Sequence, residues 1–507
     1  MYRGVQRAEE LETMHLAGAT RLCFSALMPV DSSPLKVTSS RCPVCLRPIS
    51  ARVVQRGDSI VMAKSCAEHG DFETLLSASA AHYHLAHGRS DCCSDGATSS
   101  CDRNGANSCC AGGNPNAVDP FERLSTCVAL IEIVESCNLS CPTCFASSPL
   151  GTNEALKYTT SSEVRARIAG VVARKGFIDI IQLSGGEPTL HPDFFEILEW
   201  CLQHAKIGYV LVNTNAVRVA TDEGFRERLG ALRRQRGKFE LYVQFDGVQE
   251  RGQRELRGAD LRKIREQAID SAGALGVPST LAMTVTEETI DALGDTVRFA
   301  VPRRHVRGIA FQPRFTSGRL DGSAPMIEST TLPIARCMTR TMARPISVGD
   351  IVQALAKQAS EFVSAEDFTP LPCGDPNCHT IGYILRTKDG TVPLSRLISL
   401  EALQGFLSNR VDYRLEDLVQ CGCETEPLGE VLRALETSHG TLGADAPFRF
   451  FIKPFMDAST FDQDRIDRCC THVIRPDGSL ESFCRYYLEG GEPGFRERQQ
   501  TREEVRT

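Results

Sequence analysis

Between residues 125 and 320 the chain alternates short apolar runs with longer amphipathic stretches. The stretch Ser162 to Lys175 is typical of the latter, with Val164, Ile168 and Val171 at helical spacing after a serine start. Near-continuous apolar strands separated by helices indicate a parallel sheet built from βα units. We predict an α/β fold in which six units form a partial (β/α)6 TIM-type barrel. The six strands are expected in CVALIEIV, FIDIIQLS, GYVLVNT, FELYVQFD, STLAMTV and VRGIAFQ.

The alternation of apolar runs and amphipathic stretches stops on both sides of this region. The rest of the chain can therefore be divided into an N-terminal and a C-terminal part. Residues 1–90 are predicted to form a small N-terminal unit, and residues 91–124 a linker loop rich in Cys, Gly and Ser. Residues 321–490 form a mixed C-terminal region with several cysteine groups. The charged end, residues 491–507, is predicted to be a disordered tail.

Composition and charge narrow the class of protein. The 507 residues are 42% hydrophobic and 24% charged, as in ordinary globular proteins. A formal net charge of -7 argues against non-specific nucleic-acid binding. No apolar run approaches the roughly 18 residues that cross a bilayer, and the first 30 residues lack the layout of a secretory signal. We predict a cytoplasmic protein with no membrane span and no nucleic-acid partner.

The 22 cysteines are the unusual feature of the composition. In a reducing compartment, clustered cysteines more often hold metals or iron–sulfur clusters, whereas single ones are small core residues. We expect Cys23, Cys201 and Cys337 in the core. Cys201 lies on the apolar face of a helix predicted from Pro192 to His204.

The segment ESCNLSCPTCFA directly after the first apolar run carries Cys137, Cys141 and Cys144 in C-x3-C-x2-C spacing. Active-site loops follow the strand ends of barrels, and three thiolates on one short loop suit a [4Fe–4S] cluster. Three ligands leave one iron open, as catalytic metals keep an exchangeable position. These cysteines are therefore the predicted catalytic and metal-binding residues. The alternative is a zinc site that lacks its fourth ligand.

A second motif, LSGGEPTLHPD at residues 183–193, ends the second apolar run. Its two glycines let backbone approach a ligand closely, and Glu187 can accept a hydrogen bond from an ammonium group. Together the two motifs resemble those of the radical S-adenosylmethionine (SAM) enzymes, whose open iron binds SAM and whose cluster cleaves a carbon–sulfur bond to give a carbon radical. The resemblance implies that SAM contacts Ser184, Gly185, Gly186, Glu187, Asn213, Asn215, Gln244 and Asp246. For the last four of these, loop capping is the alternative.

The resemblance extends from about Arg41 to Tyr487. Segments such as RCPVCLRPISARVV, VMAKSCAEHGDFETLL, PCGDPNC and FMDASTFDQDRIDRCCTHVIRPDGSLESFC resemble the branch that includes archaeal tetraether lipid synthase and the dihydropterin methyltransferases. The branch implies a rubredoxin-like or zinc-ribbon site with iron or zinc in the N-terminal unit. Two thiolates two residues apart, joined by a third from a distant segment, also suit a tetrahedral metal site. The expected ligands are Cys42, Cys45 and Cys66, with His69 or a later cysteine as the fourth.

Further cysteines lie on C-terminal loops beside Pro or Gly. Pooled, they could hold an auxiliary iron–sulfur cluster, and unligated core thiols are the alternative. The predicted ligands are Cys373, Cys378, Cys469, Cys470 and Cys484. For Cys421 and Cys423, in QCGC, the pattern leaves membership of either group open. His472 is a reserve ligand or a proton donor, with a capped surface histidine as the alternative.

The linker loop departs from the branch. In place of a C-G-L-C-x2-H stretch it carries adjacent cysteine pairs, which suit a soft, thiophilic ion. The cysteines of this loop are the adjacent pairs Cys92–Cys93 and Cys109–Cys110, with the single Cys101 between them.

The resemblance implies a radical SAM transferase that cleaves SAM reductively, with electrons from a donor such as flavodoxin or ferredoxin. It would alkylate, methylate or couple an unactivated carbon of a small pterin or lipid-like substrate. Two alternatives stay open. One is radical transfer of a 3-amino-3-carboxypropyl group to a thiophilic centre such as arsenic(III), suggested by the cysteine pairs. The other is a non-catalytic metal-binding or redox-sensing protein, which does not require Gly185, Gly186 and Glu187 after Cys144.

Overall fold

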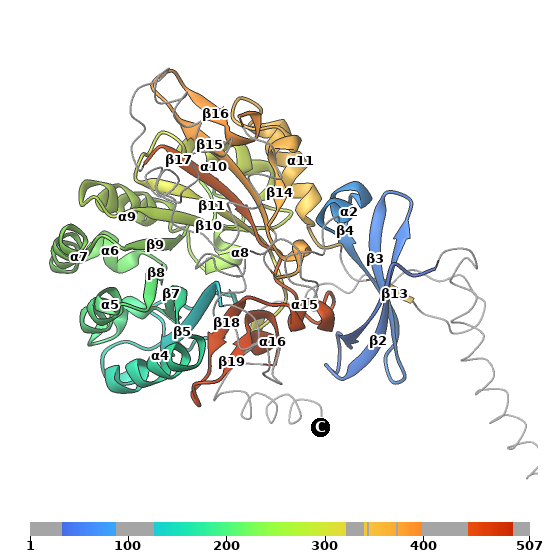
Figure 1. Ribbon diagram of the computed structural model, residues 1–507, viewed down its shortest axis with the longest axis horizontal. Coiled ribbons are helices and arrows are strands. Elements are labelled where there is room, and N and C mark those ends of the chain that lie inside the picture. The colour runs from blue at the N-terminus through green and yellow to red at the C-terminus, as the bar shows by residue number, and fades with distance from the viewer. Residues whose placement is uncertain are drawn as a thin grey trace, which may run out of the picture.

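A computed structural model describes residues 33–87, 126–320, 339–341, 344–371, 374–397 and 445–489 of the chain. In these residues a large mixed sheet is covered on its outer side by helices, and a small sheet from the N-terminal segment lies beside it (Figure 1). The predicted linker loop and tail lie outside the described residues. So do Cys23, Cys337, Cys421, Cys423 and the five cysteines of the linker loop.

The N-terminal segment forms an antiparallel sheet in which consecutive strands pair, followed by one helix. A short later strand, β13 (Thr339–Thr341), pairs in parallel with β4. Alternate side chains of the hairpins, among them Val53, Ile60 and Met62, are buried against the helix, as expected for strands with one covered face. The elements are β1 (Lys36–Arg41), β2 (Pro48–Arg56), β3 (Ser59–Cys66), β4 (Gly70–Ser77) and α2 (Ala80–His87).

All six predicted apolar runs form strands of the large sheet, which confirms this part of the sequence analysis. They are parallel and neighbour one another in chain order, as expected where each connection is a helix. Their bounds are β5 (Val128–Val134), β7 (Ile178–Gly185), β8 (Ile207–Thr214), β9 (Phe239–Gln244), β10 (Ser279–Val285) and β11 (Val306–Pro313).

Helices connect these strands and cover the outer face of the sheet, except for the short α8 (Gln253–Arg257), which lies on the inner side (Figure 1). The first, α4 (Ser161–Lys175), begins after Thr160, whose hydroxyl accepts a hydrogen bond from the Glu163 amide. Its Val164, Ile168 and Val171 are fully buried, as the spacing predicts. The others are α5 (Phe194–Gln203), α6 (Val217–Thr221), α7 (Glu223–Arg236), α8 (Gln253–Arg257), α9 (Arg262–Ala274) and α10 (Leu293–Ala300). Cys201 on α5 is fully buried, which confirms its core position.

The C-terminal region adds strands to both edges of this sheet. β17 (Pro447–Ile452) is parallel to β11, and β18 (Thr471–Ile474) is parallel to β5. Lys453, just after β17, donates a hydrogen bond to the Thr471 hydroxyl of β18 at 2.7 Å. The two outermost parallel strands therefore approach each other across the inner face of the sheet.

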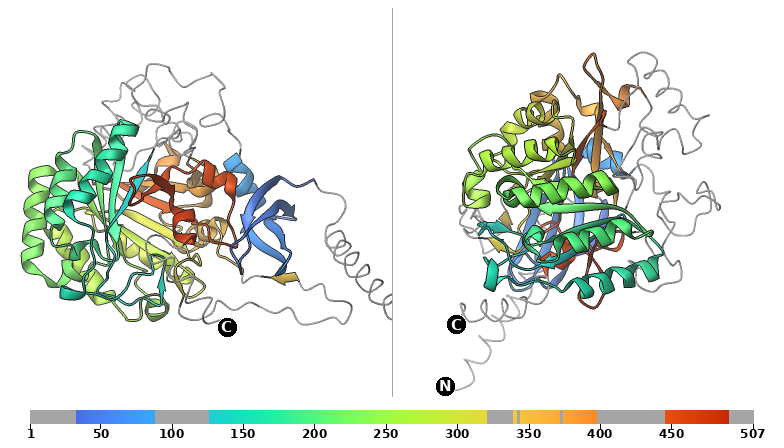
Figure 2. Two further views of the ribbon diagram at one scale, coloured as in Figure 1. Left: turned by 90° about the horizontal axis from the view of Figure 1, so that it is seen from below. Right: turned by 90° about the vertical axis from the view of Figure 1, so that its left-hand side faces the viewer.

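The C-terminal end of the described chain, red in Figure 2 (left), lies between the central sheet and the N-terminal sheet. The remaining C-terminal elements extend the large sheet at its edges or pack against it. They are α11 (Val348–Gln358), β14 (Thr369–Pro370), β15 (Thr380–Arg386), β16 (Thr391–Pro393), α15 (Gln463–Asp467), β19 (Leu480–Ser482) and α16 (Phe483–Leu488). In the part of the chain that the structure describes, no helix combines the length and apolarity that crossing a membrane demands.

The N-terminal sheet docks on the C-terminal region through a buried lysine. The amine of Lys64 on β3 donates hydrogen bonds to the carbonyls of Ala458 and Ser459, at 2.6 and 2.8 Å. Lys36 on β1 pairs with Asp462 at 2.8 Å. These bonds connect the cysteine-bearing N-terminal sheet to the loop that precedes α15.

Candidate active site

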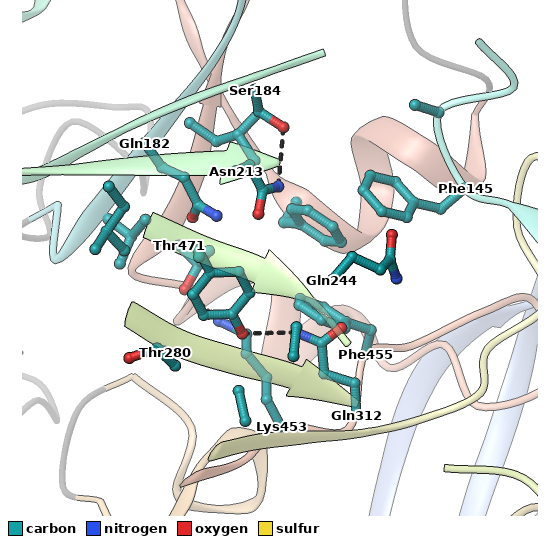
Figure 3. Close-up of a pocket in the computed structure, with 18 of the residues that line it drawn as sticks. Phe145, Gln182, Ser184, Asn213, Gln244, Thr280, Gln312, Lys453, Phe455 and Thr471 are labelled. Carbon is teal, nitrogen blue, oxygen red and sulfur yellow. Dashed lines mark hydrogen bonds between the residues drawn. The ribbon is translucent and has the colours of Figure 1, made fainter. Parts of the chain in front are cut away.

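A cavity of about 240 Å³ lies on the inner face of the large sheet (Figure 3). Its walls come from the parallel strands, from the loops after β5 and β7, and from the C-terminal region. Most residues predicted to hold the cluster and SAM line it: Cys137, Cys141, Cys144, Ser184, Gly185, Gly186, Asn213, Asn215 and Gln244. Residues that are 107 positions apart in the chain therefore face one space.

The cysteine loop is closed by its own backbone. The Cys137 amide donates to the Pro149 carbonyl at 2.9 Å, and the Gly151 amide donates to the Cys137 carbonyl at 3.0 Å. Within the loop, β6 (Thr143–Cys144) pairs with β12 (Arg319–Leu320), which follows β11. The loop is therefore held by bonds that do not depend on its thiols, which leaves these free to bind a metal.

Burial raises the pKa of Cys137 to about 12, and the nearby Glu187 carboxylate adds to this shift. Burial also raises the pKa of Cys141, while the Arg257 guanidinium opposes the shift. A thiol with a raised pKa keeps its proton in water near neutral pH, and it becomes a thiolate where a metal replaces that proton. The three thiols thus fit a metal cluster, in which each binds a different iron.

Two glycines bring the end of β7 against the end of β5. A Cβ atom on Gly186 would lie 2.1 Å from the Ser136 carbonyl oxygen, and one on Gly185 would lie 2.0 Å from the Val134 carbonyl oxygen. Gly185 also has a φ of 122°, which side chains rarely permit. Only glycine therefore allows this loop to pack directly on the base of the cysteine loop.

Glu187, which the sequence analysis expects to contact SAM, has its carboxylate bonded to neighbouring protein groups instead. The side chain is 1% exposed and does not line the cavity. One carboxylate oxygen accepts from the hydroxyls of Thr189 and Thr214, at 2.6 and 2.8 Å, and the other accepts from the Asn215 amide at 2.7 Å. With both oxygens occupied, Glu187 ties the loop after β7 to the loop after β8.

The polar residues after β7 and β8 meet at the cavity wall. Asn213 donates to the Ser184 hydroxyl at 3.1 Å (Figure 3). Asn215 donates to the Asn138 side chain at 2.7 Å and approaches the Cys137 sulfur at 3.7 Å. Asn215 therefore holds the cysteine loop against the end of β8, while Asn213 connects β8 to β7, and both side chains face the cavity.

Asp246 is fully buried and faces two arginines instead of the cavity. Arg257 contacts its carboxylate at 2.6 and 2.9 Å, and Arg265 contacts it at 3.2 Å. Burial alone would raise the pKa of Asp246, but the arginines outweigh it and lower the pKa to about 2. Arg257 lines the cavity beside Gln244. Sequence reasoning missed Arg257, because a single arginine at the end of a short helix carries no pattern.

Polar side chains on the strands were also missed. Gln182, Glu240, Tyr242, Thr280 and Gln312 point into the cavity from four strands, and Gln312 donates to the Tyr242 hydroxyl at 2.8 Å (Figure 3). In FELYVQF, Glu, Tyr and Gln alternate with apolar residues. This period of two was the available signal that one face of the strand is polar.

The N-terminal cysteines converge on one point. The ligand atoms of Cys42, Cys45, Cys66 and His69 all lie within 4.8 Å of one another. Burial alone would raise the pKa of Cys66, but hydrogen bonds from His69 and nearby groups outweigh it and lower the pKa to about 6. Within the described ranges this is the only group of three or more Cys, His, Asp or Glu side chains so close together. The distances between these ligand atoms are those expected around a single metal ion.

The C-terminal cysteines divide into two places. Burial raises the pKa of Cys378 to about 11, and it raises those of Cys469 and Cys484. The adjacent Cys470 thiol adds to the shift in the pKa of Cys469, and so do the Cys484 and Cys378 thiols, which places Cys378, Cys469 and Cys484 near one another. Cys470 instead packs against Cys127 at the cavity, and Cys373 lies outside the described residues.

His472 on β18 is fully buried, so it is not the capped surface histidine that the sequence left as an alternative. Its Nδ1 lies 3.1 Å from the Thr126 hydroxyl.

Comparisons with known proteins agree with this geometry. Residues 131–300 match the model of the radical SAM superfamily, and residues 34–78 match that of the HMPTM N-terminal zinc ribbon domain. The chain is 25% identical to 7,8-dihydro-6-hydroxymethylpterin dimethyltransferase of Methanocaldococcus jannaschii, over 89% of this chain and 93% of that one. It is 30% identical to GTP 3',8-cyclase of Haemophilus ducreyi over 31% of this chain and 44% of the cyclase.

Among solved structures, Streptococcus suis SuiB bound to its precursor peptide SuiA superposes with a TM-score of 0.30 and 16% identity, over 37% of this chain and 39% of SuiB. This overlap is too limited to carry an argument. The family match identifies residues 131–300 as a radical SAM domain, and the similarity to the pterin dimethyltransferase extends over most of the chain.

The buried ion pairs of Asp246 with Arg257 and Arg265 should contribute to the free energy of unfolding. Replacing Asp246 by Asn leaves two buried guanidinium groups without their counter-charge, which we expect to lower the free energy of unfolding by about 3 kcal/mol or more. Chemical denaturation of the metal-free chain measures this. Asp260→Asn is the matched control, since Asp260 pairs with Arg262 at the surface and should cost less than about 1 kcal/mol. Equal effects of the two substitutions would contradict the assignment.

Proposed function

We propose that this protein is a radical SAM methyltransferase that acts on a carbon of a pterin-like small molecule. The observation that carries the proposal is the shared cavity, in which three cysteines and the loops expected to hold SAM face the same polar strand residues. Similarity over most of the chain to a protein named as a pterin dimethyltransferase supports the substrate class.

The site divides into a cofactor end and a substrate end. We propose that Cys137, Cys141 and Cys144 bind a [4Fe–4S] cluster, and that Ser184, Asn213 and their neighbours bind SAM. When bound, the cluster supplies the electron that cleaves a carbon–sulfur bond of SAM. An external donor such as flavodoxin or ferredoxin would supply that electron to the cluster.

The aromatic wall of the cavity would protect the reaction from water. Phe145, directly after Cys144, packs against Phe315 and Phe483 with ring centroids 6.1 and 5.6 Å apart, and Phe455 packs against Phe483 at 4.3 Å. All four rings line the cavity. Excluding water favours radical chemistry, because a reactive intermediate is then kept from side reactions.

We interpret the parallel strands as a partial barrel of the TIM type around this cavity. The hydrogen bond between Lys453 and Thr471 across the two outer strands supports this reading. The six strands from the central region would form most of the wall. The predicted units 1–90, 125–320 and 321–490 are then three parts of one structure, since the last part supplies strands at both edges of the sheet.

The cysteine loop is tested by substitution. Replacing Cys137, Cys141 and Cys144 together by Ala should abolish SAM cleavage in the anaerobically reconstituted enzyme under reducing conditions and remove the iron of one cluster. Cys201→Ala, which removes a fully buried thiol outside the cavity, should leave both unchanged. Chromatography of the products also identifies the bond that breaks. 5′-Deoxyadenosine supports the proposal, and 5′-methylthioadenosine would support aminocarboxypropyl transfer. SAM cleavage by the triple variant would refute the assignment.

In the N-terminal unit we propose a single zinc or iron ion bound by Cys42, Cys45, Cys66 and His69. The four ligand atoms within 4.8 Å of one another and the zinc-ribbon match support this proposal. A unit this small has a limited core, so a bound metal contributes to its folding.

Replacing Cys42, Cys45 and Cys66 by Ser should remove one metal ion per chain and expose the N-terminal segment to limited proteolysis, because the metal no longer holds β1 to β4 together. Metal analysis by mass spectrometry and the digestion pattern measure this. The variant of the three cavity cysteines serves as the control, since it should keep this ion. An unchanged content of zinc and non-cluster iron would remove the assignment.

We further propose that Cys378, Cys469 and Cys484, with Cys373, bind an auxiliary iron–sulfur cluster. The mutual electrostatic effect of the first three thiols and their burial support this. Of the adjacent pair Cys469 and Cys470, we assign Cys469 as the ligand, because Cys470 packs against Cys127.

The adjacent pair provides a sharp test. Cys469→Ala should lose the iron of one cluster and substrate turnover, while SAM cleavage without substrate largely survives. Cys470→Ala, one residue away, should keep its iron. Iron and sulfide analysis together with electron paramagnetic resonance measures both. Full iron content in both variants would mean that these thiols are unligated core residues.

A further inference from the structure

A buried carboxylate lies at the end of the cavity opposite the cysteine loop. Glu240 on β9 is 3% exposed and lines the cavity. Its Oε1 accepts a hydrogen bond from the Thr280 hydroxyl at 2.8 Å and lies 3.5 Å from Nη2 of Arg449. The same Arg449 nitrogen donates to the Thr280 oxygen at 3.1 Å. One carboxylate oxygen is thus held by two side chains, from β10 and from β17.

The other oxygen of Glu240 has no such partner. In the described ranges the hydrogen bonds that Glu240 accepts all go to Oε1, and none goes to Oε2. A buried carboxylate is costly unless its oxygens accept hydrogen bonds. Because Glu240 lines the cavity, a ligand can supply the missing donor. The mechanism proposed above for SAM cleavage does not use this group.

The position of Glu240 along its strand sets where such a ligand would lie. It is four residues before Gln244, which lies at the cofactor end beside Arg257, so the two side chains are separated by about 13 Å along the strand. Tyr242 and its partner Gln312 lie between them. A flat bicyclic ring held at Glu240 would therefore direct its far edge toward the cofactor end.

The chemistry of the ligand follows from the acceptor. A carboxylate oxygen that still lacks a donor attracts a ligand that carries N–H groups, and the 2-amino-4-oxopyrimidine edge of a pterin presents a ring N–H beside an amino group. We propose that Glu240 binds this edge and orients the ring, so that it is a specificity-determining residue. The proposal rests on the pterin-like substrate of the proposed function. Guanine carries the same edge, so the test must distinguish a pterin ligand from a guanine nucleoside.

The test measures binding to the full chain, reconstituted anaerobically and supplied with SAM. The probes are 6-hydroxymethylpterin, guanosine, and the counterpart of the pterin with a carbonyl in place of the 2-amino group, called the dioxo compound below. Wild type should bind the pterin at least about 30-fold more tightly than the dioxo compound, since losing one partner of a buried charged hydrogen bond costs that much or more. In Glu240→Gln the pterin should bind at least about 30-fold more weakly and the preference should disappear.

Glu481→Gln is the matched control, because Glu481 is a buried glutamate that pairs with Arg485 away from the cavity. It should keep the wild-type affinity and preference. Equal binding of the pterin and the dioxo compound by wild type would overturn the role of Glu240, and this result stands even where Glu240→Gln fails to fold. An unchanged preference in a folded Glu240→Gln variant would overturn it as well.

The outcomes also separate this inference from the proposed function. If wild type binds guanosine more tightly than the pterin, and loses it in Glu240→Gln, the carboxylate role holds and the pterin substrate is wrong. If wild type binds the pterin tightly without using Glu240, the proposed function stands and this inference fails.

Discussion

The structure depends on the join between the ends of β5 and β7. The Gly186 amide donates to the Val134 carbonyl at 2.7 Å, and the Glu187 amide donates to the Ser136 carbonyl at 3.1 Å. These bonds continue the pairing of the two strands into their loops, and they require a backbone without a Cβ atom at residue 186. Because Cys137 follows Ser136 directly, the join places the first thiol of the cysteine loop beside the loop expected to contact SAM.

Around this join, buried charges hold the loops in place. Glu187 connects the second loop to the third, and Asp246 connects the end of β9 to the helices α8 and α9 through Arg257 and Arg265. A carboxylate that is buried and fully hydrogen-bonded is rigid, because each of its partners would lose a bond if it moved. Glu187 and Asp246 thus position the site, while neutral amides and Arg257 face the cavity.

The C-terminal region completes the site rather than adding a separate one. Its strands β17 and β18 bring Arg449, Lys453 and Thr471 to the cavity, and its helix α16 brings Phe483 onto the cysteine loop. The N-terminal sheet in turn holds the loop before α15 through Lys64. A displacement of the N-terminal sheet would therefore be transmitted through packed structure to the loop that leads into α15 and Cys469.

The sequence by itself determined the features that repeat locally or sit in one short motif. The six strands, the α4 face of Val164, Ile168 and Val171, and the core position of Cys201 follow from periodicity, because burial of one face imposes that period. The grouping of Cys137, Cys141 and Cys144, and of Cys42 with Cys45, follows from spacing within a loop. These need only a few neighbouring residues to define them.

Only the tertiary structure decided which side chains meet from distant segments. It turned Glu187 and Asp246 away from the cavity, since each found several buried donors that no local pattern reveals. It separated Cys469 from Cys470, because adjacent residues on an extended segment point to opposite sides. It also placed Glu240 at the end of the cavity opposite the cysteine loop, beside Thr280 and Arg449, which lie 40 and 209 residues further along the chain. Such pairs depend on how the sheet curves and which strands neighbour each other, and this information is spread over the whole chain rather than held in any one segment.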